Sequence, residues 1–402
     1  MFTLREAIRS LSHNRSRSVL LLLCAALLCG CMAFYLGNIR ANEEALERLA
    51  MTTPVKVWVA SGNGERSSPL NIMERHMEAF TGNPYLTDFN VTALGAAALS
   101  QEARTQEPFT GGDAKITAVN SIEILQELGL ECSFAGGYDG SFLSGDQPLC
   151  MMEQTAMEGL GLSLGDELTL PVYFVRMRPG GVMEFLPLGE QSLTLAGSCT
   201  GADSAQTFYV PVNWLFQTAK AAGQEFAYSS CSAMVKDPRQ LNSFKATVES
   251  MAFLDVDSES YDEFNGATLL VDDRNFIAAA EPLGKNITSF RGFLLPFFGL
   301  ITVLVMLVIF LILRGSRRDM AIAVSLGRPK VLTALSSFLA ALAAEAVGCL
   351  LALPVILLGA GLSFAGGLAV CGGFLLCAAV GNALGLLLLL RFDVMALLIA
   401  AE

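Results

Sequence analysis

Charge is scarce in this sequence. Only 16% of its 402 residues are charged, 53% are hydrophobic, and the mean hydropathy is +0.51. Soluble chains carry about 25% charged and about 45–50% apolar residues. The composition excludes an ordinary soluble protein, a disordered chain and a nucleic-acid-binding protein, so we expect no nucleic-acid partner.

Motifs for catalysis are also lacking. The sequence has two histidines, and His76 lies in a polar stretch with Glu74, Arg75 and Glu78, which predicts a solvated side chain. No G-x-x-x-x-G-K-[ST] phosphate loop occurs, so energy from ATP would have to come from another chain. We expect no catalytic residue, metal ligand or cofactor on this chain, and a membrane-anchored enzyme would need a catalytic cluster that is not visible.

Four apolar runs are present instead, at residues 19–37, 291–314, 331–358 and 368–390. Each is long enough for a transmembrane helix, which needs about 20 residues. The net charge of −12 divides unevenly around them. Residues 38–290 carry −18, and the remaining residues carry +6.

The positive residues predict the orientation, because excess Lys and Arg marks the cytoplasmic side. They precede the first run, separate the second from the third, and follow the fourth. Residues 1–18, 315–330 and 391–402 are therefore expected in the cytoplasm, with 38–290 and the short 359–367 loop outside. The alternative for the N-terminus is a secretory signal with a poor lipoprotein-type cleavage sequence at Leu28–Cys31.

Two cytoplasmic segments have helical character. Thr3 and Glu6 fit a capping box, and Leu4, Ile8 and Leu11 recur at helical spacing, which predicts an interfacial amphipathic helix. The alternative is a basic leader that only sets topology. In 315–330, an apolar stretch, Met320–Leu326, ends at a helix-stopping glycine. It either covers a partner protein or simply returns the chain to the membrane.

These segments resemble a known family. The stretch LREAIRSL at 4–11 resembles the start of MacB/FtsX-type ABC transporter permeases, and RRDMAIAVSLG at 317–327 resembles their R-x-E…A-L-G signature. GLGLSLGDELTL at 159–170 is similar to a stretch of the MacB-type outer domain. Asp319 replaces the usual glutamate, the proline that often follows the last span is missing, and Glu345 lies deeper in its span than the acid of many relatives.

The resemblance implies a bundle of four transmembrane helices with a mixed α+β extracytoplasmic domain between spans one and two. It implies a permease subunit that works with an ABC ATPase subunit, which binds the ATP, and with a second permease copy or a paralogue, in contact with membrane lipid. Its cargo would be a peptide, lipid or lipoprotein. The alternative is a signalling subunit that activates an external partner such as a cell-wall hydrolase. The residues expected to couple to the ATPase are Leu4, Ile8, Leu11, Arg317, Arg318, Asp319, Met320, Leu326 and Gly327.

Residues 38–290, expected outside the cell, are predicted to form a mixed α/β domain. Strands are expected at 56–60, 168–175, 192–197 and 267–271, and helices at 71–80 and 240–251. The flanking segments, 38–50 and 274–290, are expected to be stalk helices, the second kinked near Pro282 and Gly284, or else ordinary linkers.

The last predictions concern the ten cysteines and one acid in an apolar run, Glu345. Six cysteines lie in the apolar runs, where cysteine acts as a small apolar residue. For the four external ones we expect disulfides Cys132–Cys150 and Cys199–Cys231, or else free buried thiols. Glu345 is the one acid inside a span, at a cost of about 2.5–3.5 kcal/mol, so it should face protein for helix packing, assembly or proton movement.

Overall fold

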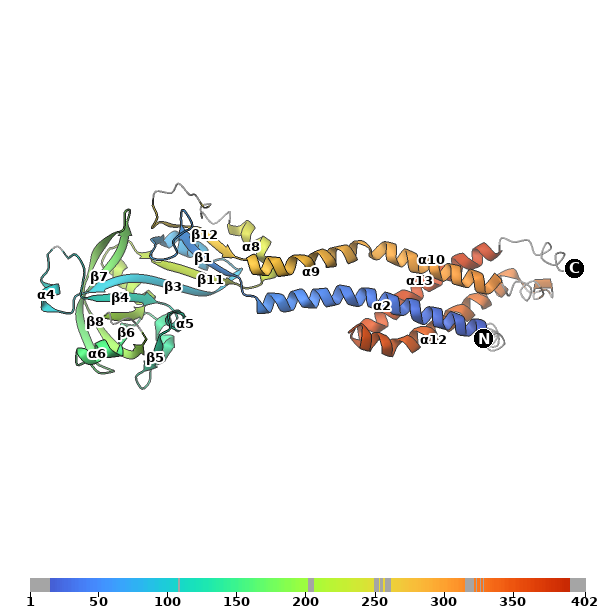
Figure 1. The fold of residues 1–402 in the computed structure, drawn as a ribbon, viewed down its shortest axis with the longest axis horizontal. Helices are drawn as coiled ribbons and strands as arrows, with labels where there is room; N and C mark the ends of the chain where they lie inside the picture. The colour runs from blue at the N-terminus through green and yellow to red at the C-terminus, as the bar shows by residue number, and fades with distance from the viewer. Residues whose placement is uncertain are drawn as a thin grey trace. The chain divides into compact units, whose positions relative to one another are not determined.

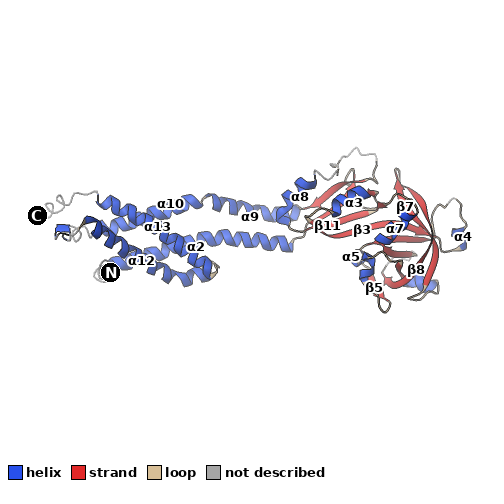
Figure 2. Ribbon diagram, turned by 180° about the vertical axis from the view of Figure 1, so that it is seen from behind, coloured by secondary structure: helices blue, strands red, loops and turns tan. Residues whose placement is uncertain are grey.

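The computed structural model describes residues 15–390 except 108, 202–205, 249–252, 254–255, 257–261, 315–321, 323, 326 and 328. It contains two compact units (Figures 1 and 2). One is helical and combines Met1–Leu49 with Ala278–Glu402, and the other, Ala50–Ile277, is built mainly of strands. Each unit is considered by itself below.

Among the described residues, four helices are long and apolar enough to cross a membrane. They are α2 (Arg15–Thr52), α10 (Leu294–Arg314), α12 (Lys330–Gly359) and α13 (Phe364–Leu390). The number agrees with the four apolar runs of the sequence. Many large apolar side chains on these helices remain exposed, such as Leu295 and Leu358, as expected for surfaces that face lipid tails.

Helix α9 (Arg274–Gly292) runs beside α2 in the helical unit (Figure 1). Arg291 forms an ion pair of 2.6 Å with Glu43, and the Tyr35 hydroxyl donates to the Phe290 carbonyl at 2.6 Å. The Tyr35 ring also stacks on Phe297. Both predicted stalk segments are thus helical. Helix α9 continues through Pro282 and is interrupted only at Phe293, before α10 begins.

Glycines allow close contacts inside the bundle. A Cβ atom at Gly381 of α13 would lie 2.7 Å from the Thr302 carbonyl oxygen of α10. At Gly348 of α12 it would lie 2.7 Å from the Leu22 carbonyl oxygen of α2. Gly381 and Gly385 form a G-x-x-x-G pattern, whose small residues let two membrane helices approach at backbone distance.

The second unit contains a sheet of ten strands in the order β12-β1-β11-β3-β4-β9-β6-β8-β5, with β7 paired to both β3 and β8. The pairs β4–β9 and β6–β8 are parallel, and the others are antiparallel. Because β7 bridges β3 and β8, six strands (β3, β4, β9, β6, β8 and β7) close into a ring of pairings. Two further strands, β2 and β10, pair with each other.

The strand bounds are β1 Lys56–Ser61, β2 Ile72–Met73, β3 Leu86–Ala97, β4 Ala114–Val119, β5 Glu131–Phe134, β6 Leu149–Glu153, β7 Glu167–Arg178, β8 Val182–Thr200, β9 Thr207–Pro211, β10 Ala227–Tyr228, β11 Ser230–Val235 and β12 Gly266–Asp272. The four predicted strands fall within β1, β7, β8 and β12. The core includes fully buried Ile116, Phe174 and Phe208.

Short helices connect these strands. They are α3 Glu74–Thr81, α4 Gln101–Arg104, α5 Ile122–Glu127, η1 Gly140–Ser144, α6 Gln154–Gly159, α7 Val212–Ala221, η2 Pro238–Gln240 and α8 Leu241–Val248. The predicted helix at 71–80 therefore begins later than expected, because Ile72 and Met73 pair with β10. The Asp237 side chain caps η2 by accepting from the Arg239 amide.

The expected disulfides are not formed. All four cysteines outside the apolar helices are free thiols, and the sheet order explains why. Cys199 lies on β8 and Cys231 on β11, with several strands between them. Cys132 and Cys150 lie on β5 and β6, on opposite sides of β8. A disulfide needs Cα atoms about 4.4–6.8 Å apart, and neighbouring strands are already about 4.8 Å apart, so both predicted pairings are wrong.

Cys132 instead lies directly opposite Cys199 in the antiparallel pair of β5 and β8. Opposed residues in such pairs have Cα atoms about 4.5–5.5 Å apart, which suits a disulfide. Burial raises the pKa of the Cys132 thiol and raises the pKa of Cys199 to about 12. Thiolates are therefore rare at neutral pH, and oxidation should be slow there.

We expect oxidised glutathione to link Cys132 to Cys199, with two molecules of reduced glutathione released, and to do so faster as the pH rises. Peptide mapping by mass spectrometry checks the linkage, and the Cys132→Ser variant serves as the control that cannot form it. Cys150 and Cys231 should stay alkylatable once the protein is unfolded. A disulfide that contains either of them would contradict the strand register.

Candidate functional site

Most of the predicted coupling residues lie outside the described residues. These are Leu4, Ile8, Leu11, Arg317, Arg318, Asp319, Met320 and Leu326. Gly327 is described, with a φ of 94° and its amide donating to the Val324 carbonyl at 3.0 Å. A glycine with positive φ commonly ends a helix, and α12 begins three residues later at Lys330.

Glu345 forms the polar centre of the helical unit. It lies on α12 and is 1% exposed, and Asn382 on α13 is fully buried. The Asn382 Nδ2 donates to Glu345 Oε2 at 2.7 Å. Glu345 is therefore enclosed by the described helices of this unit. Its partner was missed, although Asn382 lies inside the G-x-x-x-G pattern that brings α13 against its neighbours.

The contacts of this pair favour a neutral carboxylic acid. In the described part of the chain no Lys or Arg side chain pairs with Glu345, and Glu345 Oε1 and Asn382 Oδ1 are both buried with no hydrogen-bond partner. A buried charge without a partner is very costly, and such a group usually becomes neutral instead. A proton on Glu345 would also provide the donor that these two acceptor oxygens lack. The pair can therefore hold α12 and α13 together or carry a proton.

The α/β unit has a cavity of about 810 Å³ bordered by β2, α3, β7 and α7. Three of its four basic side chains, Arg176, Arg178 and Lys220, are paired with acids. Lys220 contacts Glu74 at 2.6 Å, and Arg176 contacts Glu184 at 2.9 Å. The hydrogen bond from Arg178, together with that from Arg176, lowers the pKa of Glu184 to about 2 despite its partial burial. Most of the positive charge in the wall of this cavity is therefore neutralised by neighbouring carboxylates, and the cavity has no strong preference for an anionic or a cationic ligand.

A second cavity of about 400 Å³ has Glu74, Glu78, Phe216 and Tyr228 in its wall. Burial raises the pKa of Tyr228 to about 12, and the nearby Glu74 carboxylate adds to that shift. Aromatic faces and carboxylates both favour cations. Lys220 already occupies such a position, 4.4 Å from the centre of the Phe216 ring.

His76 does not have the solvated position that its polar neighbours predicted. It is 3% exposed and stacks on Phe253 with ring centres 5.3 Å apart. The buried residues of α3 are His76, Met77 and Phe80. His76 and Phe80 are four positions apart and so lie on the same face of the helix, which is the face that packs on the core. No described carboxylate or cysteine groups with it as a set of metal ligands.

No protein-family model matches this chain, and no curated protein matches its sequence. Among solved structures, the periplasmic region of MacB from Actinobacillus actinomycetemcomitans is similar at a TM-score of 0.32 and 10% sequence identity. The match covers 58% of this chain and 95% of that chain. By its own architecture, this chain is a membrane protein with four apolar helices and one large mixed α/β domain.

Proposed function

We propose that this chain is the permease subunit of an ABC transporter of the MacB/FtsX type. ATP hydrolysis on a separate ATPase subunit would move the extracytoplasmic domain to export or extract a peptide, lipid or lipoprotein. One observation carries this proposal. A single α/β unit is inserted between the first and second of four apolar helices, and its neighbours on both sides in the chain are helices, α2 and α9.

The stalk helices support a mechanical role. Most of the stability of a helix in a protein comes from packing against other elements, so a helix that transmits force gains from lateral contacts. Helix α2 extends for 38 residues without a break, and Arg291, Tyr35 and Phe290 tie α9 to it. Movement of either helix at the cytoplasmic side would thus be shared by the other.

The basic residues support an orientation with both termini in the cytoplasm of a bacterial cell. The helix predicted at 4–11 and the segment 317–327 would then lie on the same side as the ATPase. A second permease copy, or a paralogue, would complete the transporter. The acidic 38–290 domain would lie outside, where its net charge of −18 favours cationic partners over strongly anionic ones.

The test is whether the full chain co-purifies with an ABC ATPase subunit from the cells that express it. We expect deletion of residues 2–12, or replacement of Met320–Leu326 by polar residues, to abolish the association. Met183→Ser is the matched control, because Met183 is 55% exposed but lies on β8 of the α/β unit. An intact complex after both changes would contradict the coupling assignment. A cell-wall hydrolase captured by the outer domain in the full-length protein would favour signalling over transport.

A further inference from the structure

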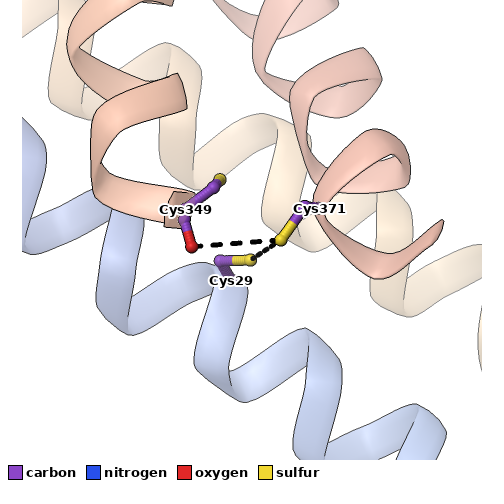
Figure 3. A group of neighbouring side chains, drawn as sticks. All are labelled: Cys29, Cys349 and Cys371. Atoms are coloured by element: carbon purple, nitrogen blue, oxygen red, sulfur yellow. Dashed lines mark hydrogen bonds between the residues drawn. The ribbon is translucent and has the colours of Figure 1, made fainter. Parts of the chain in front are cut away.

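Three cysteines from three helices meet inside the helical unit (Figure 3). Cys29 lies on α2, Cys349 on α12 and Cys371 on α13, and none is more than 7% exposed. Their sulfur atoms all lie within 4.8 Å of one another, and the Cys29 and Cys371 sulfurs are 4.0 Å apart. From the sequence, each was expected only to act as a small apolar residue.

The spacing of these sulfurs is that of a metal site. A metal–thiolate bond of about 2.3 Å places the sulfurs of a trigonal site about 4.0 Å apart. The Cys29–Cys371 distance already has this value, and the Cys349 sulfur lies within 4.8 Å of both of the other sulfurs. Sulfur packing alone does not require three thiols from separate helices to converge on one point.

The surroundings select the kind of metal. The cluster around the thiols is apolar and includes Ile301, Val305 and Phe374, together with Met32, which lies one turn after Cys29. No described histidine or carboxylate joins the group. Thiolate and thioether ligands suit Cu(I), zinc and iron–sulfur clusters. Structural zinc sites are almost always four-coordinate and iron–sulfur clusters are typically held by four cysteines, so three thiols fit Cu(I) best. An apolar interior also favours a site with little net charge.

We propose that Cys29, Cys349 and Cys371 form a binding site for a soft monovalent cation, Cu(I), within the membrane bundle. Binding forms metal–sulfur bonds and breaks one S–H bond, and the released proton passes to solvent. Loss of one proton leaves one thiolate, two thiols and Cu⁺, which together are neutral. The metal would join α2, α12 and α13 and so hold the bundle in one packing. The site is independent of the proposed coupling to an ATPase.

The test is an anaerobic titration of the reduced full-length protein in detergent with Cu(I) held by a chromogenic chelator. The wild type should take one Cu(I) per chain from the chelator. The combined Cys29→Ser, Cys349→Ser and Cys371→Ser variant should lose that equivalent. The matched control replaces Cys24, Cys31 and Cys377, which lie on α2 and α13 outside the group of three thiols, and should keep it.

A second measurement needs no substitution, which matters if the triple variant misfolds. Alkylation of the wild type is continued until the three buried thiols of the metal-free protein react. Peptide mass spectrometry should then show Cu(I) protecting Cys29, Cys349 and Cys371 but not Cys31, which is exposed. No Cu(I) uptake by the wild type, or uptake that is lost in the control variant instead, would overturn the proposal. Equal alkylation of the three cysteines with and without Cu(I) would also overturn it.

Discussion

The Gly381→Ala variant is expected to have a markedly less stable membrane bundle than the wild type. The added methyl group would lie 2.7 Å from the Thr302 carbonyl oxygen and 3.1 Å from the Met306 amide nitrogen. Both are backbone atoms, so α10 and α13 must move apart. Overpacking of this kind costs about 1–3 kcal/mol, more than the about 0.5–1 kcal/mol that alanine gains over glycine in a helix.

The measurement is an SDS titration in detergent followed by far-UV circular dichroism. Tryptophan fluorescence would not report on the bundle, because Trp58 and Trp214 both lie in the α/β unit. Gly372→Ala is the matched control. Gly372 lies on the same helix and is exposed, and a methyl group added there would have no neighbouring atom within 4 Å. Equal midpoints for the two variants would show that α10 and α13 do not touch at Gly381.

Glu345→Ala is expected to destabilise the bundle more than Glu345→Gln. Alanine leaves the buried Asn382 amide without its partner, which costs about 1–3 kcal/mol before any cavity term. Glutamine keeps a carbonyl oxygen for Asn382 Nδ2 and adds an N–H that can donate to Asn382 Oδ1. It therefore imitates the protonated acid in shape and hydrogen bonding.

The same SDS titration separates the two states of Glu345. If the acid is neutral in the folded bundle, Glu345→Gln should have nearly the wild-type midpoint. If the protein needs a carboxylate there, Glu345→Gln should be weakened about as much as Glu345→Ala. Glu345→Leu tests packing alone, since it fills the volume but leaves Asn382 unpaired. A wild-type midpoint for the leucine variant would mean that the hydrogen bond is unimportant.

The helical unit was the part most open to prediction, because a long apolar run has few alternatives to a membrane helix. Strand β1 was also predicted, and it begins with alternating buried and half-buried residues. Strands β6 (Leu149–Glu153) and β9 (Thr207–Pro211) were missed. Every residue in them is buried, so they lack the alternation with a period of two that identifies a strand.

Pairings between distant residues could not be predicted. The partner of Cys199 depends on the strand order, which places β5 beside β8, and four cysteines allow three pairings. The Glu345–Asn382 bond joins residues 37 positions apart, and the Cys29–Cys371 contact joins residues 342 apart. Such contacts depend on how helices pack. In a single sequence, the signal for this packing is the pattern of small residues, such as G-x-x-x-G.

The α/β unit begins with β1 and ends with β12, and these two strands are hydrogen-bonded neighbours with Lys56 opposite Asp272. Its two chain ends therefore meet at one place, four residues after α2 and two before α9. Domains whose termini lie close together tolerate transfer into another protein. The whole unit is thus an exchangeable module. Evolution, or an engineer, can replace it between the same two helices while the buried contacts of the membrane bundle stay unchanged.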